Sequence, residues 1–136
     1  MTTTPPPSNP TAGQPQQGPA APLTMHGQYI KDFSFENPRA PQSLIEQTQP
    51  QLTLNVQVAN RQFDTKTFEV SLTIEASAHT PEKEPLFMLE LVYAGTVTLG
   101  DLPQDAYGPM LYIETPRLLF PFARAIVANT TREAGF

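Results

Sequence analysis

The chain has 136 residues and a formal net charge of −5, from 13 acidic and 8 basic side chains, and its length suits a single domain. It contains no cysteine, which excludes disulfides and thiolate chemistry. No cluster of Lys and Arg suits a phosphate backbone, so we expect no nucleic-acid partner. No apolar run reaches the ~18 residues of a spanning helix, so we expect no direct insertion into a membrane.

Residues 1–25 are predicted to form a disordered tail rich in Pro, Gln and Thr. The first 30 residues carry no charged side chain, and seven of the 16 prolines lie within the first 22. Such a segment buries too little apolar surface to offset the entropy of ordering it. It also lacks the basic and apolar regions of a secretory signal. The folded domain is therefore predicted to span residues 26–136.

The first predicted strand runs from Tyr29 to Glu36, where the side chains alternate as in a half-buried strand. One face is expected to carry Tyr29, Lys31, Phe33 and Phe35. The carboxylates of Asp32 and Glu36 lie on the other face, about 13 Å apart at ~3.3 Å per residue. That spacing exceeds the ~5–9.5 Å of acid–base pairs in glycoside hydrolysis, so we expect no catalytic pair here. The polar face either contacts a partner or simply faces water.

The next segment, residues 37–50, is predicted to be a long connection with prolines at positions 38, 41 and 50. Its only large apolar residues are Leu44 and Ile45. Loops of this length with little structure of their own are often functional. The two residues either fix the loop on the core or line a binding site, and the pattern leaves both open.

Three further strands follow. Residues Gln51–Ala59 and Thr67–Ala78 alternate regularly and are predicted to form an antiparallel hairpin that buries one face. The strand Leu86–Leu99 is apolar on both faces except at Glu90. A strand with two apolar faces must be covered twice or meet a partner, so this strand indicates assembly. Gly95 is expected to mark a bulge or a bend.

The remaining chain is predicted to be helical. A short helix is expected over Gln104–Ile113, and Thr115 with Pro116 is expected to begin a second helix that ends at Ala134-Gly135. Pro121 lies inside this helix and should bend it. The helix carries a broad apolar stripe: Leu118, Leu119, Phe122, Ala123, Ile126 and Val127. The predicted fold is α+β, with a four-stranded antiparallel sheet and the C-terminal helices packed on one face.

Three segments in the same order, GQYIKDFSFENPRAP, PLFMLELVYAG and LLFPFARAIV, resemble the SecB family of cytosolic chaperones. The resemblance covers the chain from about Gly27 to its end. It implies an ATP-independent chaperone, without cofactor, that binds unfolded precursor proteins in the cytoplasm and delivers them to the SecA ATPase. It also implies a homotetramer built as a dimer of dimers. The alternative is an oligomeric structural or adaptor domain without client binding; a small-ligand enzyme is the third possibility.

The resemblance also implies roles for individual residues. The SecA-docking face would comprise Asp32, Glu36, Met88 and Glu90, and each pair shares one face of its strand by parity. Leu44 and Ile45 would line the groove that binds clients. The tetramer interface would comprise Leu89, Leu91, Tyr93, Leu119, Phe122 and Ile126.

Family members usually continue beyond the position of Phe136 with another amphipathic helix, which covers the groove, and an acidic tail. The chain as given is expected to lack both. His79 with Glu82 and Glu84 has no recurring ligand spacing, so we expect no metal site.

Overall fold

The computed structural model describes residues 3–4, 21–46 and 49–136. Most of the predicted tail, residues 1–25, therefore lies outside the described residues. The first strand, β1 (Leu23–Glu36), nevertheless begins inside the predicted tail, several residues before Tyr29.

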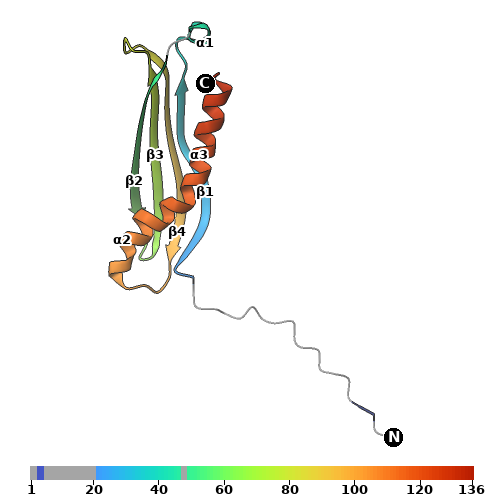
Figure 1. Cartoon of the computed structure of the whole chain (residues 1–136). Coiled ribbons are helices and arrows are strands. Elements are labelled where there is room, and N and C mark those ends of the chain that lie inside the picture. The colour runs from blue at the N-terminus through green and yellow to red at the C-terminus, as the bar shows by residue number, and fades with distance from the viewer. Residues whose placement is uncertain (1–2, 5–20, 47–48) are drawn as a thin grey trace.

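Four antiparallel strands form one sheet in the order β1-β4-β3-β2 (Figure 1). The other three strands are β2 (Gln51–Gln62), β3 (Thr67–His79) and β4 (Pro85–Leu99). The crossover segment, residues 37–50, carries the chain from one edge of the sheet to the other. Strands β1 and β2 are thus consecutive in sequence but form opposite edges, and the predicted sheet is confirmed.

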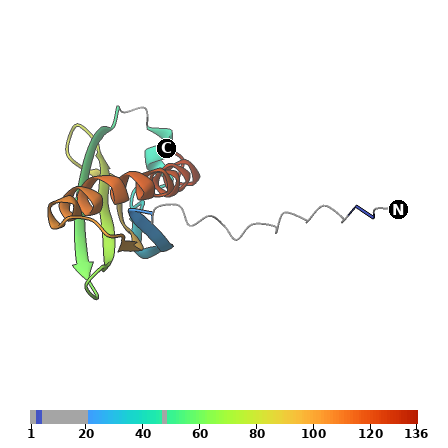
Figure 2. The ribbon, with the colours of Figure 1, turned by 90° about the horizontal axis from the view of Figure 1, so that it is seen from below.

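The C-terminal helices lie on one face of this sheet, as predicted (Figures 1 and 2). A 3₁₀ turn, η1 (Gln104–Ala106), leads through α2 (Tyr107–Pro109) and a π-helical turn, η2 (Met110–Glu114), into α3 (Thr115–Glu133). Helix α3 begins at Thr115, as predicted, but Thr115 does not act as its cap, because Glu114 before it already has helical dihedrals. Thr115 is buried, and its hydroxyl donates to the Met110 carbonyl at 2.7 Å instead of capping.

Helix α3 ends as predicted. Gly135 adopts φ +96°, a left-handed conformation that suits glycine. The Gly135 N–H donates to the Arg132 carbonyl at 3.0 Å, and the Phe136 N–H donates to the Thr131 carbonyl at 2.9 Å. This pair of bonds is a Schellman motif, which satisfies the last carbonyls of the helix.

The core lies between α3 and the sheet face that it covers, here called the helix face; the opposite face is the open face. Alternate residues of the central strands are buried on the helix face: Val70, Leu72, Ile74, Leu91, Val97 and Leu99. Leu119 and Ala123 of α3 are both 0% exposed against them. A Cβ on Gly95 would lie 2.9 Å from Leu119 Cδ2, so Gly95 allows the close approach of α3. The predicted bulge or bend at Gly95 is wrong, because this residue pairs regularly on both sides.

Bulges occur in β1 instead, where His26 and Lys31 are extra residues without a partner on β4. Each bulge reverses the alternation of the side chains. Tyr29 therefore lies opposite Ala94 on the open face, whereas Phe33 lies opposite Leu91 on the helix face. The prediction that Tyr29 and Lys31 share a face with Phe33 and Phe35 is wrong for this reason.

Candidate functional site

The residues predicted for the docking face lie together on the open face. Glu36 lies directly opposite Met88, and Asp32 lies opposite Val92, which is two residues from Glu90 on the same face. The bulge at Lys31 precedes Asp32, so the parity of Asp32 and Glu36 is undisturbed. The structure therefore brings the four predicted residues into one area at the interface of β1 and β4.

Sequence reasoning missed a further carboxylate in this area, Glu75 of β3, which lies directly opposite Glu90. Glu36, Glu75 and Glu90 line a hollow of about 340 Å³ on the open face. We call Asp32, Glu36, Glu75 and Glu90 the acidic quartet. None of the four forms an ion pair with a residue that the structure describes. Glu75 could have been identified only from the pairing of β3 with β4. The side-chain pattern of one strand does not show that pairing.

A buried carboxylate, Glu69, lies farther along the same face. Lys31 Nζ lies 2.5 Å from Glu69 Oε1, and the Tyr29 hydroxyl donates to the other carboxylate oxygen. The hydrogen bond from Lys31, followed by that from Tyr29, lowers the pKa of Glu69 below its usual value. Burial, followed by the bond to Glu69, raises the pKa of Tyr29. Arg61 of β2 lies directly opposite Glu69.

The helix face of β2 is apolar but uncovered. Leu52 is 73% exposed, Leu54 67% and Val56 41%. Helix α3 crosses the sheet obliquely, from the end of β2 near α2 toward β1, and moves away from the first half of β2 (Figure 1). The prediction that this face of β2 is buried is therefore wrong for Leu52, Leu54 and Val56, whereas Val58 packs partly against the core.

An apolar groove lies between β2 and α3, and Val56 and Phe120 line both of its hollows. A hollow of about 180 Å³ continues along Leu54 and Val127, and a hollow of about 540 Å³ continues along Val58. The backbone edge of β2 beside the groove is unpaired, because β2 pairs only with β3 within the described chain. We call this region the β2–α3 groove. Its lining is almost wholly apolar, and its flank offers free backbone donors and acceptors.

The crossover segment holds the residues predicted for the client groove. Leu44 and Ile45 lie on the short helix α1 (Gln42–Ile45), and they are 49% and 78% exposed. Leu44 packs against the end of α3, since a Cβ on Gly135 would lie 2.7 Å from Leu44 Cδ2. Neither residue lines the β2–α3 groove. They form a separate apolar patch beside the C-terminus.

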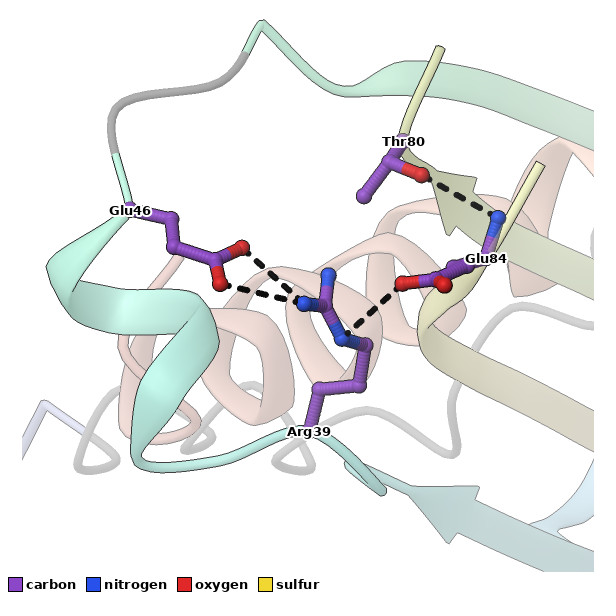
Figure 3. Close-up of polar contacts among 4 residues, drawn as sticks. All are labelled: Arg39, Glu46, Thr80 and Glu84. Atoms are coloured by element: carbon purple, nitrogen blue, oxygen red, sulfur yellow. Dashed lines mark hydrogen bonds and ion pairs between the residues drawn. The ribbon is translucent and has the colours of Figure 1, made fainter. Parts of the chain in front are cut away.

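Arg39 fixes this segment to the turn between β3 and β4 (Figure 3). Its guanidinium lies 3.0 Å from Glu46 Oε2 and 3.4 Å from Glu84 Oε2. The Glu84 N–H in turn donates to the Thr80 hydroxyl at 3.1 Å. At the other end of the segment, Asn37 Nδ2 donates to the Ala134 carbonyl at 3.2 Å. The crossover segment is thus anchored to two parts of the chain.

The residues predicted for the tetramer interface fall into two groups. Four are almost wholly buried within one chain, beneath or within α3: Leu89, Leu91, Tyr93 and Leu119. They offer little surface to a second copy in the single chain, because α3 covers that face of β4, and their role in a tetramer interface stays a prediction. Phe122 is 54% exposed, and Leu118 one turn earlier is 47% exposed. Ile126 packs partly against the core.

Two features are absent from residues 3–4, 21–46 and 49–136. No three His, Asp or Glu side chains there are placed to hold a metal ion together. No helix within those ranges has the length and apolar character needed to cross a membrane.

The chain is similar to known proteins both in sequence and in fold. Residues 16–136 match the family described as preprotein translocase subunit SecB. A protein-export protein SecB from a Bradyrhizobium species is 50% identical over 95% of this chain and 80% of its own length. The protein of the same name from Afipia carboxidovorans is 52% identical over 80% of this chain and 68% of its own length. The fold resembles a SecB-like chaperone from Mycobacterium tuberculosis, solved with an antitoxin peptide, with a TM-score of 0.70, 13% identity and 86% coverage of both chains.

Proposed function

Because this chain belongs to the SecB family of protein-export chaperones, we propose that it holds unfolded precursor segments in the β2–α3 groove and presents them to SecA through its acidic open face. The observation that carries the proposal is the uncovered helix face of β2. Unfolded precursors expose apolar side chains together with unpaired backbone groups. The groove offers a matching surface for both, as apolar contacts and as a free strand edge.

Such binding would depend little on client sequence. Backbone hydrogen bonds along the edge of β2 are available to any extended segment, and the apolar floor selects only for hydrophobicity. Burial of apolar surface contributes roughly 25 cal/mol per Å², so a few contacts suffice for reversible holding. No bond needs to be made or broken in this cycle, and we infer that the protein is not an enzyme.

A charge in the groove should weaken client binding. We expect Leu54→Asp to fold normally, because the side chain is 67% exposed, but to suppress the aggregation of an unfolded precursor poorly. The matched control is Gln57→Asp, on the same strand but on the open face. Light scattering during dilution of the precursor from denaturant measures the effect. Equal suppression by both variants would place the client site elsewhere, and no suppression by the wild type would favour the adaptor alternative.

We infer that SecA docks on the acidic quartet and Met88. Reversing Asp32 and Glu36 to Lys should leave folding and client holding intact, because exposed carboxylates contribute little to stability. SecA binding should fall sharply at low salt and less at moderate salt. Calorimetric titration measures it, with Glu82→Lys/Glu133→Lys as the control of equal charge change. If both double variants lose SecA affinity equally, net charge rather than this face controls docking.

We also infer that the protein is a cytoplasmic homotetramer, a dimer of dimers. The free edge of β1 suits pairing with a second copy, and the outward face of α3, with Leu118 and Phe122, suits packing of two dimers. A cytoplasmic location follows from the proposed role, since precursors must be bound before export.

A further inference from the structure

Charge is segregated along the open face. The four strands contain two Lys or Arg side chains, Lys31 and Arg61. Both adjoin Glu69: Lys31 forms an ion pair with it, and Arg61 lies directly opposite it on the neighbouring strand. The acidic quartet at the other end of the face is left without a cation among the described residues.

The bulge in β1 brings Lys31 onto the same face as Asp32. On a regular strand Lys31 and Asp32 would point to opposite faces, but the extra residue places both on the open face. A lysine side chain is long enough to pair with a carboxylate on the adjacent residue. Left free, Lys31 would therefore neutralise Asp32, a member of the quartet.

Glu69 draws the ammonium group of Lys31 in the other direction. Glu69 lies opposite Thr96 of β4, whereas Asp32 lies opposite Val92. Four residues along a strand correspond to about 13 Å. The Lys31 head group is thus drawn toward Glu69, and it forms no ion pair with Asp32.

The geometry of Glu69 suits this task. Its side chain is only 11% exposed, and the Tyr29 hydroxyl donates to the oxygen that Lys31 leaves free. The carboxylate is therefore fixed in position. Its lowered pKa keeps it ionised across the neutral range.

We propose that Glu69 is a positioning residue of the docking face, which holds Lys31 away from Asp32 so that the acidic quartet meets a basic partner segment without an internal competitor. This inference rests on the proposed docking role of the quartet. It deepens that role, because it explains how a face that contains a lysine beside a docking carboxylate still attracts a basic partner.

A double-mutant cycle tests the proposal, with Glu69→Gln and Lys31→Met alone and together. The probes are a lysine-rich peptide and SecA, titrated at low salt. In the presence of Lys31, Glu69→Gln should lower affinity about 3- to 5-fold, the range of one exposed charge pair. In the Lys31→Met background the same change should alter affinity less than about 2-fold, because no cation remains to be released.

The cycle separates positioning from simple loss of charge or of structure. Loss of one negative charge, or local unfolding, would lower affinity equally in both backgrounds, and that result would overturn the proposal. Tyr29→Phe removes no charge and should show a smaller effect with the same dependence on Lys31, even if Glu69→Gln folds poorly. A wild type that fails to bind the lysine-rich peptide would also overturn it. Coupling with the peptide but no binding of SecA would reject the docking role and retain the role of Glu69.

Discussion

At the scale of single residues, Gly95 controls the distance between α3 and the sheet. The space above it is filled by Leu119 and by Met25, whose sulfur would lie 2.8 Å from an added Cβ. Leu119 is 0% exposed and has no room to withdraw. An interior packed to this density responds to a single additional methyl group.

We therefore expect Gly95→Ala to lower the free energy of unfolding by about 1–3 kcal/mol, the usual range for overpacking a core. Denaturant titration followed by circular dichroism measures it. The control is Gly27→Ala in β1, where an added Cβ would meet nothing within 4 Å. A destabilisation of similar size at Gly27 would show that loss of glycine in a strand, rather than contact with α3, is the cause.

The lowered pKa of Glu69 predicts that its contribution to stability depends on pH. Its pKa lies below the ordinary value of 4.5, mainly because of the hydrogen bond from Lys31. A carboxyl group with a lowered folded pKa stabilises the fold above its unfolded pKa, and this stabilisation is lost as pH falls through the folded pKa. The difference in unfolding free energy between the wild type and Glu69→Gln should thus shrink on acidification below about pH 4.5. Denaturant titrations at several pH values between 7 and 3 measure it; a difference independent of pH would contradict the assignment.

At the scale of elements, the strands and the end of α3 follow from local signals. Alternation locates β2, β3 and β4, and Gly135 marks the helix end because only glycine readily adopts its conformation. The bulges at His26 and Lys31 could not be predicted, since they depend on pairing with β4. The capping role expected of Thr115 could not be checked from its residue type alone, because the preceding π-helical turn runs directly into α3.

The candidate sites likewise combine features that are local to one strand with features that depend on how elements pack together. Parity within one strand correctly grouped Asp32 with Glu36 and Met88 with Glu90, because that relation is local. Glu75 joins them only through the register of β3 against β4. The β2–α3 groove depends on the direction in which α3 crosses the sheet, and no single segment contains that information.

At the scale of the whole molecule, the fold leaves two kinds of surface that a single chain does not cover. The edges formed by β1 and β2 carry unpaired backbone groups. The outward face of α3 carries Leu118 and Phe122, which lie four residues apart and hence on one side of the helix. Assembly through these surfaces would bury what the single chain exposes.

We expect Phe122→Glu to convert tetramers into dimers without unfolding the chain, because this side chain is 54% exposed. Leu91→Glu is the contrasting variant. Leu91 is 0% exposed, so a charge there should unfold the chain instead of separating subunits. Light scattering after gel filtration measures the mass, and circular dichroism measures folding. Folded Phe122→Glu that remains tetrameric would show that α3 is not the contact between dimers.

The two bulges of β1 have a consequence for how this strand can change over time. Each one shifts the phase of the strand by a single position, so they act together like two compensating frameshifts in a coding sequence. Only the residues between His26 and Lys31 alternate between the two faces with the opposite parity. The two ends of β1 share one parity. Loss of His26 or of Lys31 would remove one bulge and leave the other residues of β1 opposite their present partners on β4, whereas loss of a regularly paired residue would exchange the faces on one side of it. Single-residue deletions in this strand should therefore be tolerated at the two bulges and not at the regularly paired positions between them.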